Sequence, residues 1–300
     1  MAGHVDSVFT WFGERIKDQD STALFLLVPV TLFEVAFFVV PFCILLRMSF
    51  NAQSPNGFYE SAWTLASYQE VLRSDLLHDI LLFSFKFAVI ATVLSVIIGL
   101  FYAYAVYRAD GFKRSILLFA VVLPLLTTLV VKTYAWRPLL SPDGVLNNVL
   151  LSLGVISTPI SFAPGLFGAV VGQVYIVVPY SILSIYSVLS TIDWAVVEAA
   201  RDLGASRPRS FVEVVLPEVL PGIAVATVVS FAWSVGAYAA PSQLGSGQQT
   251  TFAMYVEQIM LNQFNWPFGA ALSVVMLGLM LVVSLAAFRL LGGSGGVGDV

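Results

Sequence analysis

Uninterrupted apolar runs long enough to cross a lipid bilayer recur along this 300-residue chain. A bilayer-spanning helix needs about 20 apolar residues. Charged residues make up 11% of the sequence, against about 25% in ordinary soluble domains. The sequence therefore predicts an all-α, polytopic membrane protein with six transmembrane helices. We place these helices at about 23–48, 80–107, 114–136, 165–190, 221–243 and 268–291.

The basic residues predict which way the chain is inserted. Loops that face the cytoplasm carry an excess of Lys and Arg. With the N-terminus inside, three basic residues fall on the outer side: Arg47, Arg73 and Arg137. Nine then fall on the cytoplasmic side: Arg15, Lys17, Arg108, Lys113, Arg114, Arg201, Arg207, Arg209 and Arg289. Both termini are therefore expected in the cytoplasm.

Three parts of the chain are predicted from this arrangement. Residues 1–22 form a cytoplasmic N-terminal segment, residues 23–291 the transmembrane domain, and residues 292–300 a Gly-rich flexible tail. The first apolar run is too long for a signal-peptide core and lacks a small-residue cleavage pattern, so we expect a retained helix. The apolar stretch 145–156 is too short to span and is expected to form an interfacial or re-entrant helix.

Two glycines near the start of the fourth predicted span have the spacing of a helix-packing motif. Gly168 and Gly172 are four residues apart, and small residues at this interval let two helix backbones approach closely in a membrane. We therefore expect close packing here, within the chain or against a partner.

Several kinds of chemistry find no support in the sequence. The only cysteine, Cys43, and the two histidines, His4 and His78, are isolated from one another, so no metal site is predicted. There is no Gly-x4-Gly-Lys-Ser/Thr phosphate-binding loop. Ser, His and Asp show no nucleophile context, and the basic residues are too scattered for a nucleic-acid surface. We predict no catalytic residue and no cofactor bound by this chain.

The stretch 198–217 is a polar island in this apolar sequence. A short helix is predicted over about 192–203, with Asp193 as its N-cap. Its apolar side comprises Val196, Val197, Ala200 and Leu203. Gly204 supplies the left-handed residue that ends such a helix.

A second short helix is predicted after the turn at Gly204. Ser206 can cap it, Pro208 lies in its first turn, and Pro217 and Pro221 are expected to break it before the fifth span. The pattern predicts a helix–turn–helix lying across one face of the membrane domain.

The island also has a spaced pattern of residues. It reads Glu198-Ala-Ala, three residues, Gly204, nine residues, Val214, one residue and Leu216-Pro217. This resembles the E-A-A-x3-G-x9-I-x-L-P loop of permease subunits of binding-protein-dependent ABC importers, with Val214 in place of the usual Ile. The resemblance implies a coupling loop at 191–220 that docks on an ATP-hydrolysing subunit. The implied coupling residues are Glu198, Ala199, Ala200, Asp202, Gly204, Leu216 and Pro217.

Other motifs resemble the spermidine/putrescine-type permeases within this family. These are Lys132-Thr-Tyr-Ala-Trp136, Gly236-Ala-Tyr-Ala-Ala-Pro241 and Trp266-Pro-Phe-Gly-Ala-Ala-Leu-Ser273. Lys132 is a departure, because Arg is usual at that position. Permeases for iron, thiamine, phosphonates or opines share much of these motifs, so they stay open as alternatives to a polyamine permease.

The resemblance implies a type I ABC importer permease (MetI-like) fold in the inner membrane of a bacterium. The implied partners are ABC ATPase subunits that hold ATP and Mg, a second homologous permease subunit and a periplasmic substrate-binding protein. A different class, an ATP-independent secondary transporter or channel, would need pathway charges on several spans and no docking helix. The single deep carboxylate, Glu34, favours the importer.

Four residues are hypotheses for the translocation pathway. Glu34 lies in the middle of the first predicted span, where a carboxylate is costly unless it is paired or faces water. Tyr180, Trp233 and Tyr238 could present aromatic faces to an ammonium group. The alternatives are a structural or subunit contact for Glu34 and membrane-interface positions for the aromatic residues.

Overall fold

The computed structural model describes residues 28–54 and 57–292. The predicted segment 1–22 and nearly all of the predicted tail 292–300 therefore lie outside the described residues. The described parts of the chain are helical apart from loops and one isolated bridge between Ala52 and Glu60. The chain forms two compact units. Unit 1 comprises residues up to Tyr68 together with Asn265–Val274, and unit 2 comprises Gln69–Phe264 and the residues from Val275 on.

Unit 1 contains the first apolar helix, Val28–Met48. Its middle turn, η1 (Val35–Val39), is π-helical, and α2 (Val40–Met48) completes it. At the end of α2, the Arg47 guanidinium donates to Asn51 Oδ1 (2.6 Å) and to the Ala62 carbonyl (3.0 Å). It also lies 4.1 Å from the centroid of the Trp63 ring. These contacts fold the polar loop after residue 48 back onto the end of the helix.

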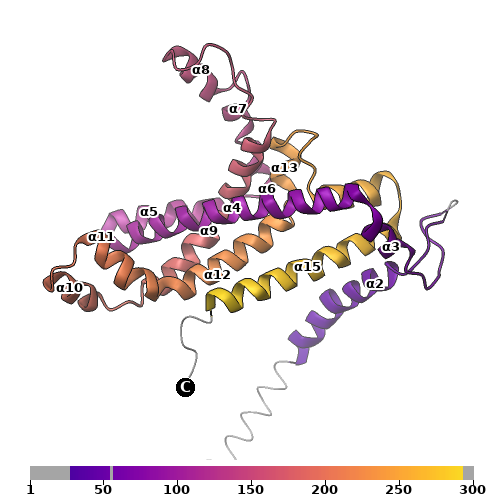
Figure 1. The fold of residues 1–300 in the computed structure, drawn as a ribbon, viewed down its shortest axis with the longest axis horizontal. Helices are drawn as coiled ribbons and strands as arrows, with labels where there is room; N and C mark the ends of the chain where they lie inside the picture. Colours follow the sequence, from indigo (N-terminus) through magenta and orange to yellow (C-terminus); the bar gives the residue numbers. More distant parts are fainter. Residues whose placement is uncertain (1–27, 55–56, 293–300) are drawn as a thin grey trace, which may run out of the picture. The chain divides into compact units, whose positions relative to one another are not determined.

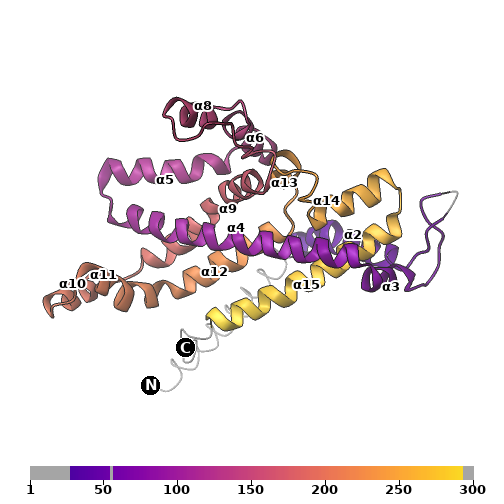
Figure 2. The same cartoon turned by 45° about the horizontal axis from the view of Figure 1, so that its top comes forward.

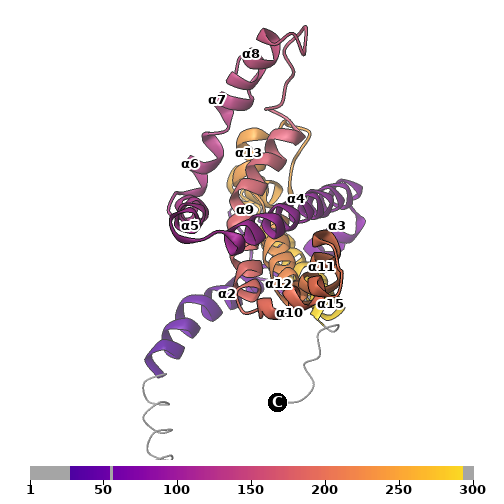
Figure 3. The same cartoon turned by 90° about the vertical axis from the view of Figure 1, so that its left-hand side faces the viewer.

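Three long helices form the core of unit 2. They are α4 (Asp75–Arg108), α9 (Leu166–Leu189) and α12 (Leu216–Val235), which lie side by side in Figures 1, 2 and 3. α4 presents small residues to its neighbours at intervals of three or four positions: Ser84, Ala88, Ala91, Ser95, Gly99 and Ala103. Small side chains permit the close backbone approach that stabilises helix pairs in lipid.

Gly168 and Gly172 make the close packing that their spacing predicts, here within the chain. A Cβ on Gly168 would lie 2.8 Å from Ala163 Cβ and 3.1 Å from the Leu244 carbonyl oxygen, and one on Gly172 would lie 2.6 Å from Leu244 Cδ1. Leu244 ends the short helix α13 (Ala239–Leu244). The two glycines therefore seat α13 against α9.

The third predicted span, 114–136, is wrong as a single helix. α5 (Gly111–Leu125) ends just after Pro124, and a new helical segment begins at Leu129 after a bend of 108°. Pro124 leaves a carbonyl unpaired one turn earlier, and Thr128 caps the next helix by accepting from the Val131 N–H. The segment after the bend contains α6 (Leu129–Tyr134), α7 (Arg137–Leu140) and α8 (Val145–Ser152). α8 confirms the short helix predicted within 145–156.

The predicted break at Pro217 and Pro221 is also wrong. α11 (Arg207–Ser210), η2 (Phe211–Val215) and α12 form one helix, Arg207–Val235, long and apolar enough to span a membrane. Pro217 lies two residues after η2, inside this continuous helix and not at its start. Pro221 is inside α12, and membrane helices tolerate proline when neighbouring groups satisfy the freed carbonyl.

The fifth predicted span, 221–243, therefore starts earlier and ends earlier than expected. It begins at Arg207 and ends at Val235, before the turn that leads to α13. The second half of the island is the beginning of this span, not a separate helix lying across the membrane face.

The remaining helices complete both units. They are α3 (Ala66–Arg73), α14 (Phe252–Glu257), η3 (Gln258–Asn262) and α15 (Trp266–Gly292). Over the described residues, five helices are long and apolar enough to cross a membrane, and the bent pair beginning with α5 is a sixth if it counts as one span.

Candidate functional site

The first half of the polar island folds as predicted. α10 covers Trp194–Asp202, and the Asp193 carboxylate accepts a hydrogen bond from the Ala195 N–H (3.0 Å). This cap satisfies one of the free N–H groups at the start of the helix. The Asp193 prediction is therefore confirmed, and α10 lies at one end of the unit 2 bundle next to α11 (Figure 2).

Gly204 ends α10 in the predicted left-handed conformation, with a φ of +96°. The Gly204 N–H donates to the Arg201 carbonyl (2.9 Å), and the Ala205 N–H donates to the Ala200 carbonyl (3.0 Å). These two bonds form a Schellman motif, which satisfies the last carbonyls of a helix and reverses the chain. Ser206 then takes the N-cap position of α11, with a proline in its first turn, as predicted, but its side chain makes no capping hydrogen bond.

Packing fixes the inner side of α10. Val197 is fully buried and belongs to one apolar cluster with Ile185 and Leu189 of α9 and with Val215 and Val219 of the helix that follows the island. This cluster attaches α10 to the ends of two long helices of unit 2. Burial of each such side chain stabilises the attachment by about 1.5–3 kcal/mol.

The outer side of α10 is a mixed polar and apolar surface. Glu198, Ala199 and Asp202 are exposed, and Ala200 is half-buried. The predicted apolar side is wrong for Leu203, whose side chain is 90% exposed, and for Val196, which is also exposed. These two residues lie on a different side of α10 from the one through which Val197 enters the buried cluster. A carboxylate and an exposed leucine thus share one surface on a capped, anchored helix.

Leu216 and Pro217, the last predicted residues of the island motif, lie elsewhere. Both are in the first turn of α12, where Leu216 packs against the buried cluster and Pro217 is exposed. Both residues are inside the Arg207–Val235 span and not on α10, so the coupling role implied for them stays a prediction.

Two of the predicted pathway residues lie together. The rings of Tyr180, on α9, and Trp233, on α12, are stacked with centroids 5.5 Å apart and an interplanar angle of 21°. The Trp233 side chain is 41% exposed, so part of the stack is open. Sequence patterns alone placed these residues on different spans with no indication of contact.

Buried polar side chains hold α9 against α12 beside this aromatic pair. The Gln173 amide donates to the Trp233 carbonyl and to Ser234 Oγ, both at 3.3 Å. The hydroxyls of Ser181 and Ser230 are 2.7 Å apart. Hydrogen bonds between membrane helices contribute about 0.6 kcal/mol each on average. The sequence analysis missed this network, because a lone Gln or Ser in an apolar run does not reveal its partner.

Tyr238 lies just beyond the end of α12 and contacts a carboxylate. Its hydroxyl donates to Glu257 Oε1 (2.9 Å), and both side chains are exposed. This hydrogen bond, followed by partial burial, raises the pKa of the Tyr238 phenol. The pair offers an aromatic ring and a carboxylate in one place, which is a combination that suits a cation.

Glu34, the fourth predicted pathway residue, belongs to unit 1. It immediately precedes η1 and is exposed. The helix around it has no buried residue. The pathway hypothesis for Glu34 therefore stays a prediction.

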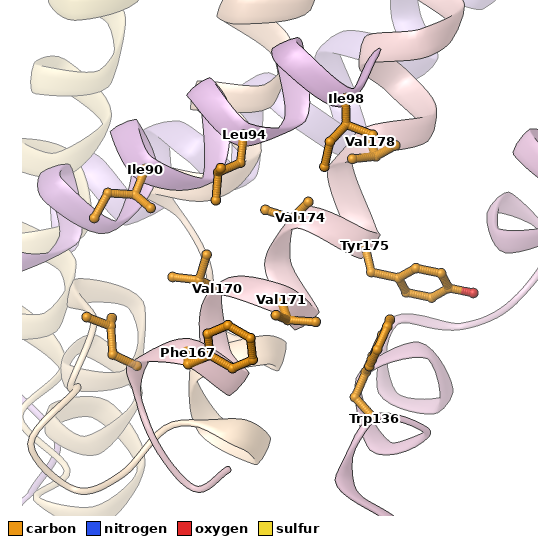
Figure 4. Close-up of a pocket in the computed structure, with 11 residues that line it drawn as sticks. Ile90, Leu94, Ile98, Trp136, Phe167, Val170, Val171, Val174, Tyr175 and Val178 are labelled. Atoms are coloured by element: carbon orange, nitrogen blue, oxygen red, sulfur yellow. The ribbon is translucent and has the colours of Figure 1, made fainter. Parts of the chain in front are cut away.

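An apolar groove of about 850 Å³ runs between α4 and α9 (Figure 4). Ile90, Leu94 and Ile98 of α4 line one side, and valines of α9 line the other. Tyr175 and Trp136 lie at one end with their rings edge to face at 5.6 Å. The lining is almost entirely carbon, so the groove cannot compensate a charged or strongly hydrated ligand. No group of three or more His, Cys, Asp or Glu residues that could hold a metal occurs in residues 28–54 and 57–292.

Comparison of the sequence with known proteins finds matches to membrane components of transport systems. Residues 95–292 match the model of the family described as binding-protein-dependent transport system inner membrane component. The spermidine/putrescine transport system permease protein PotB of Escherichia coli is 32% identical over 262 residues, which cover 86% of this chain and 94% of that protein. PotB of Haemophilus influenzae is 30% identical over 260 residues, covering 86% and 91%.

Solved structures with the same fold are also transporters. A bacterial ABC transporter involved in the import of the acidic polysaccharide alginate matches with a TM-score of 0.76 and 18% identity, covering 96% of this chain and 99% of that chain. The MetNI methionine ABC transporter, in inward-facing conformations, matches with a TM-score of 0.57 and 17% identity, covering 74% and 100%. At these identities the similarity establishes the fold.

Proposed function

The chain belongs to the family of binding-protein-dependent transport system inner membrane components, and we propose that it is the permease subunit of an ATP-driven importer for polyamines. The membrane helices of unit 2 carry the path for the substrate, and α10 receives the mechanical input. The observation that carries the proposal is α10 itself, which is capped at both ends, anchored by Val197 and exposed along Glu198 and Leu203.

The exposed side of α10 has the chemistry of a docking surface for an ATPase subunit. Glu198 offers a charge to a basic partner residue, Ala199 leaves room for close approach, and the 90% exposed Leu203 offers an apolar contact. An apolar anchor beside a charge is typical of protein interfaces. ATP and Mg would be bound by the partner, and this chain would contribute no catalytic group.

The excess of basic residues at the end that carries α10 supports a cytoplasmic location for it. The other partners in this proposal are a second, homologous permease subunit and a periplasmic substrate-binding protein. A secondary transporter or channel is less favoured, because it would have no use for an exposed helix that is capped and anchored in this way.

A polyamine substrate is supported by two observations. The PotB relatives are named for spermidine and putrescine transport, and the open Tyr180–Trp233 stack offers π faces to an ammonium group. A cation over an aromatic face gains about 0.5–1 kcal/mol at an exposed site and about 2 kcal/mol when desolvated. Such modest attraction suits a pathway, where a substrate must be released again.

The coupling proposal is tested by co-purification and transport. Glu198→Arg reverses the charge on the docking surface, and Gly204→Pro removes the N–H that closes the Schellman motif. Both variants are expected to lose a bound ATPase subunit and ATP-dependent uptake. Asp110→Arg is the matched control, since Asp110 is an exposed carboxylate in the adjoining connection between α4 and α5 and caps no helix through its side chain. Full transport by Glu198→Arg and Gly204→Pro would refute the docking role.

The substrate is tested by uptake of labelled spermidine and putrescine in cells that contain the whole transporter. Trp233→Leu is expected to lower polyamine uptake about two- to fivefold, the factor that corresponds to the 0.5–1 kcal/mol of a cation–π contact at an exposed site. Phe101→Leu is the control, because Phe101 is an exposed aromatic residue of α4 outside the stack. A binding protein that takes only a non-cationic ligand would contradict the polyamine assignment and leave the importer proposal intact.

A further inference from the structure

Trp194, the first residue of α10, has contacts that docking of an ATPase does not require. The guanidinium carbon of Arg108, the last residue of α4, lies over the indole ring, 4.9 Å from its centroid. The guanidinium carbon of Arg201, on α10 itself, lies over the same ring at 5.1 Å. The ring of Tyr107, also at the end of α4, is 5.7 Å from that of Trp194.

Hydrogen bonds extend this cluster to two further segments. Arg201 Nε donates to Ser210 Oγ (3.3 Å), and that hydroxyl donates to the Arg207 carbonyl (3.1 Å). Ser210 is fully buried at the beginning of the Arg207–Val235 helix. The Tyr107 hydroxyl donates to the carbonyl of Ile192, just before α10 (3.4 Å). The cluster thus joins α10 to the ends of α4 and of the Arg207–Val235 helix.

The composition of the cluster indicates more than space filling. The two guanidinium groups repel each other, and the attraction of each to the π face of the indole offsets this repulsion. Arginine is suited to this arrangement because its planar group stacks on aromatic rings and keeps hydrogen-bond donors free. An aliphatic side chain at position 194 could cover the apolar cluster below it, but it could not hold the two cations.

We propose that Trp194 is a positioning residue that makes α10 move as one body with the ends of α4 and of the Arg207–Val235 helix. A displacement of α10 is thereby passed to two spans of unit 2 at once. The inference rests on the proposed role of α10 as the coupling helix. It identifies the contact that carries the displacement as the Arg108–Trp194–Arg201 cluster, through residues in direct contact.

The first test measures substrate transported per ATP hydrolysed by the complete transporter in proteoliposomes. Trp194→Leu is expected to keep its ATPase subunit and its ATP hydrolysis. The amount of substrate that it transports per ATP should fall by a factor of about five or more. Trp194→Phe keeps a π face and should restore most of the ratio. Arg108→Gln should lower the ratio as well, and combining it with Trp194→Leu should add little, because both changes break the same contact.

The second test measures movement directly. Cys43 is the only cysteine, so a Cys43→Ser background accepts spin labels at Val196 (56% exposed, on α10) and Phe112 (80% exposed, at the start of α5, just after α4). In the wild-type cluster, the distance between the labels should be the same without nucleotide and with ATP. In Trp194→Leu, the distance should change with ATP or become broadly distributed.

Trp63→Leu is the matched control, since Trp63 also lies under an arginine, Arg47, but in unit 1. It should leave the transport ratio unchanged. An unchanged ratio and distance in Trp194→Leu would overturn the proposal. Loss of the ATPase from Trp194→Leu, with full coupling in Arg108→Gln, would also overturn it by leaving Trp194 a folding role only. If the wild-type chain itself purifies without an ATPase, the proposed function fails first, and the failure is visible before any variant is made.

Discussion

Replacing Gly204 by alanine isolates the energetic contribution of a single backbone conformation to α10. Gly204 has a φ of +96°, and a Cβ built on it has no atom within 4 Å. A methyl group therefore meets no neighbour, and the whole cost is local strain of the backbone. For an L-residue in the left-handed region this cost is about 1–2 kcal/mol. The strain opposes the two hydrogen bonds that close the Schellman motif.

The expected result is faster opening of the end of α10. A loss of 1–2 kcal/mol changes an opening equilibrium by a factor of about 5–30. Hydrogen-exchange mass spectrometry of the purified transporter should show this increase for the amides of Gly204 and Ala205, whose N–H groups donate to the last turn. Protection in the middle of α9 should not change, because its hydrogen bonds do not depend on the motif.

Two variants separate strain from the mere presence of a side chain. Gly204→Asn should exchange more slowly than Gly204→Ala, since Asn adopts left-handed conformations more readily. Gly247→Ala should resemble wild type, because a Cβ there also meets nothing within 4 Å and the φ of Gly247 lies outside the left-handed region. Equal exchange in Gly204→Ala and wild type would refute the reasoning.

Three further predictions concern helix packing and pH. Gly99→Ala should destabilise unit 2 by about 1–3 kcal/mol in reversible detergent unfolding, because its Cβ would lie 2.8 Å from Ser181 Cβ, whereas Gly278→Ala, with open space, should be neutral. A double-mutant cycle between Ser181→Ala and Ser230→Ala should give an interaction energy of about 0.6 kcal/mol. Glu257→Gln should lower the raised pKa of Tyr238 toward its ordinary value. Ultraviolet titration measures this pKa as the difference between a chain that contains Tyr238 and the same chain with Tyr238→Phe. The stabilising effect of this raised pKa is present below about pH 10 and is lost as the pH rises through the folded-state pKa.

Local patterns predicted the features that depend on neighbours in sequence. Asp193 caps α10 and Gly204 ends it as expected, because a cap and a left-handed glycine act within one helical turn. The long apolar helices were likewise predictable, since their length and composition satisfy the bilayer without regard to the rest of the chain.

Prolines were less informative than expected. Pro217 and Pro221 were predicted to break the helix, yet it continues through both. Pro124 does coincide with a bend, and Thr128 caps the helix that begins after it. Proline thus ends one helix and lies within another, because its effect depends on whether a neighbouring group satisfies the freed carbonyl.

The sequence by itself determined that this is an all-α membrane protein with a capped polar helix bearing the E-A-A pattern. Only the tertiary structure decided which side of that helix is free, which aromatic residues stack and which arginines share Trp194. Leu203 is exposed and Val197 is buried although both are apolar and lie on the same short helix. The difference arises because burial and pairing depend on the other helices that pack against a residue, and that information is non-local in the chain.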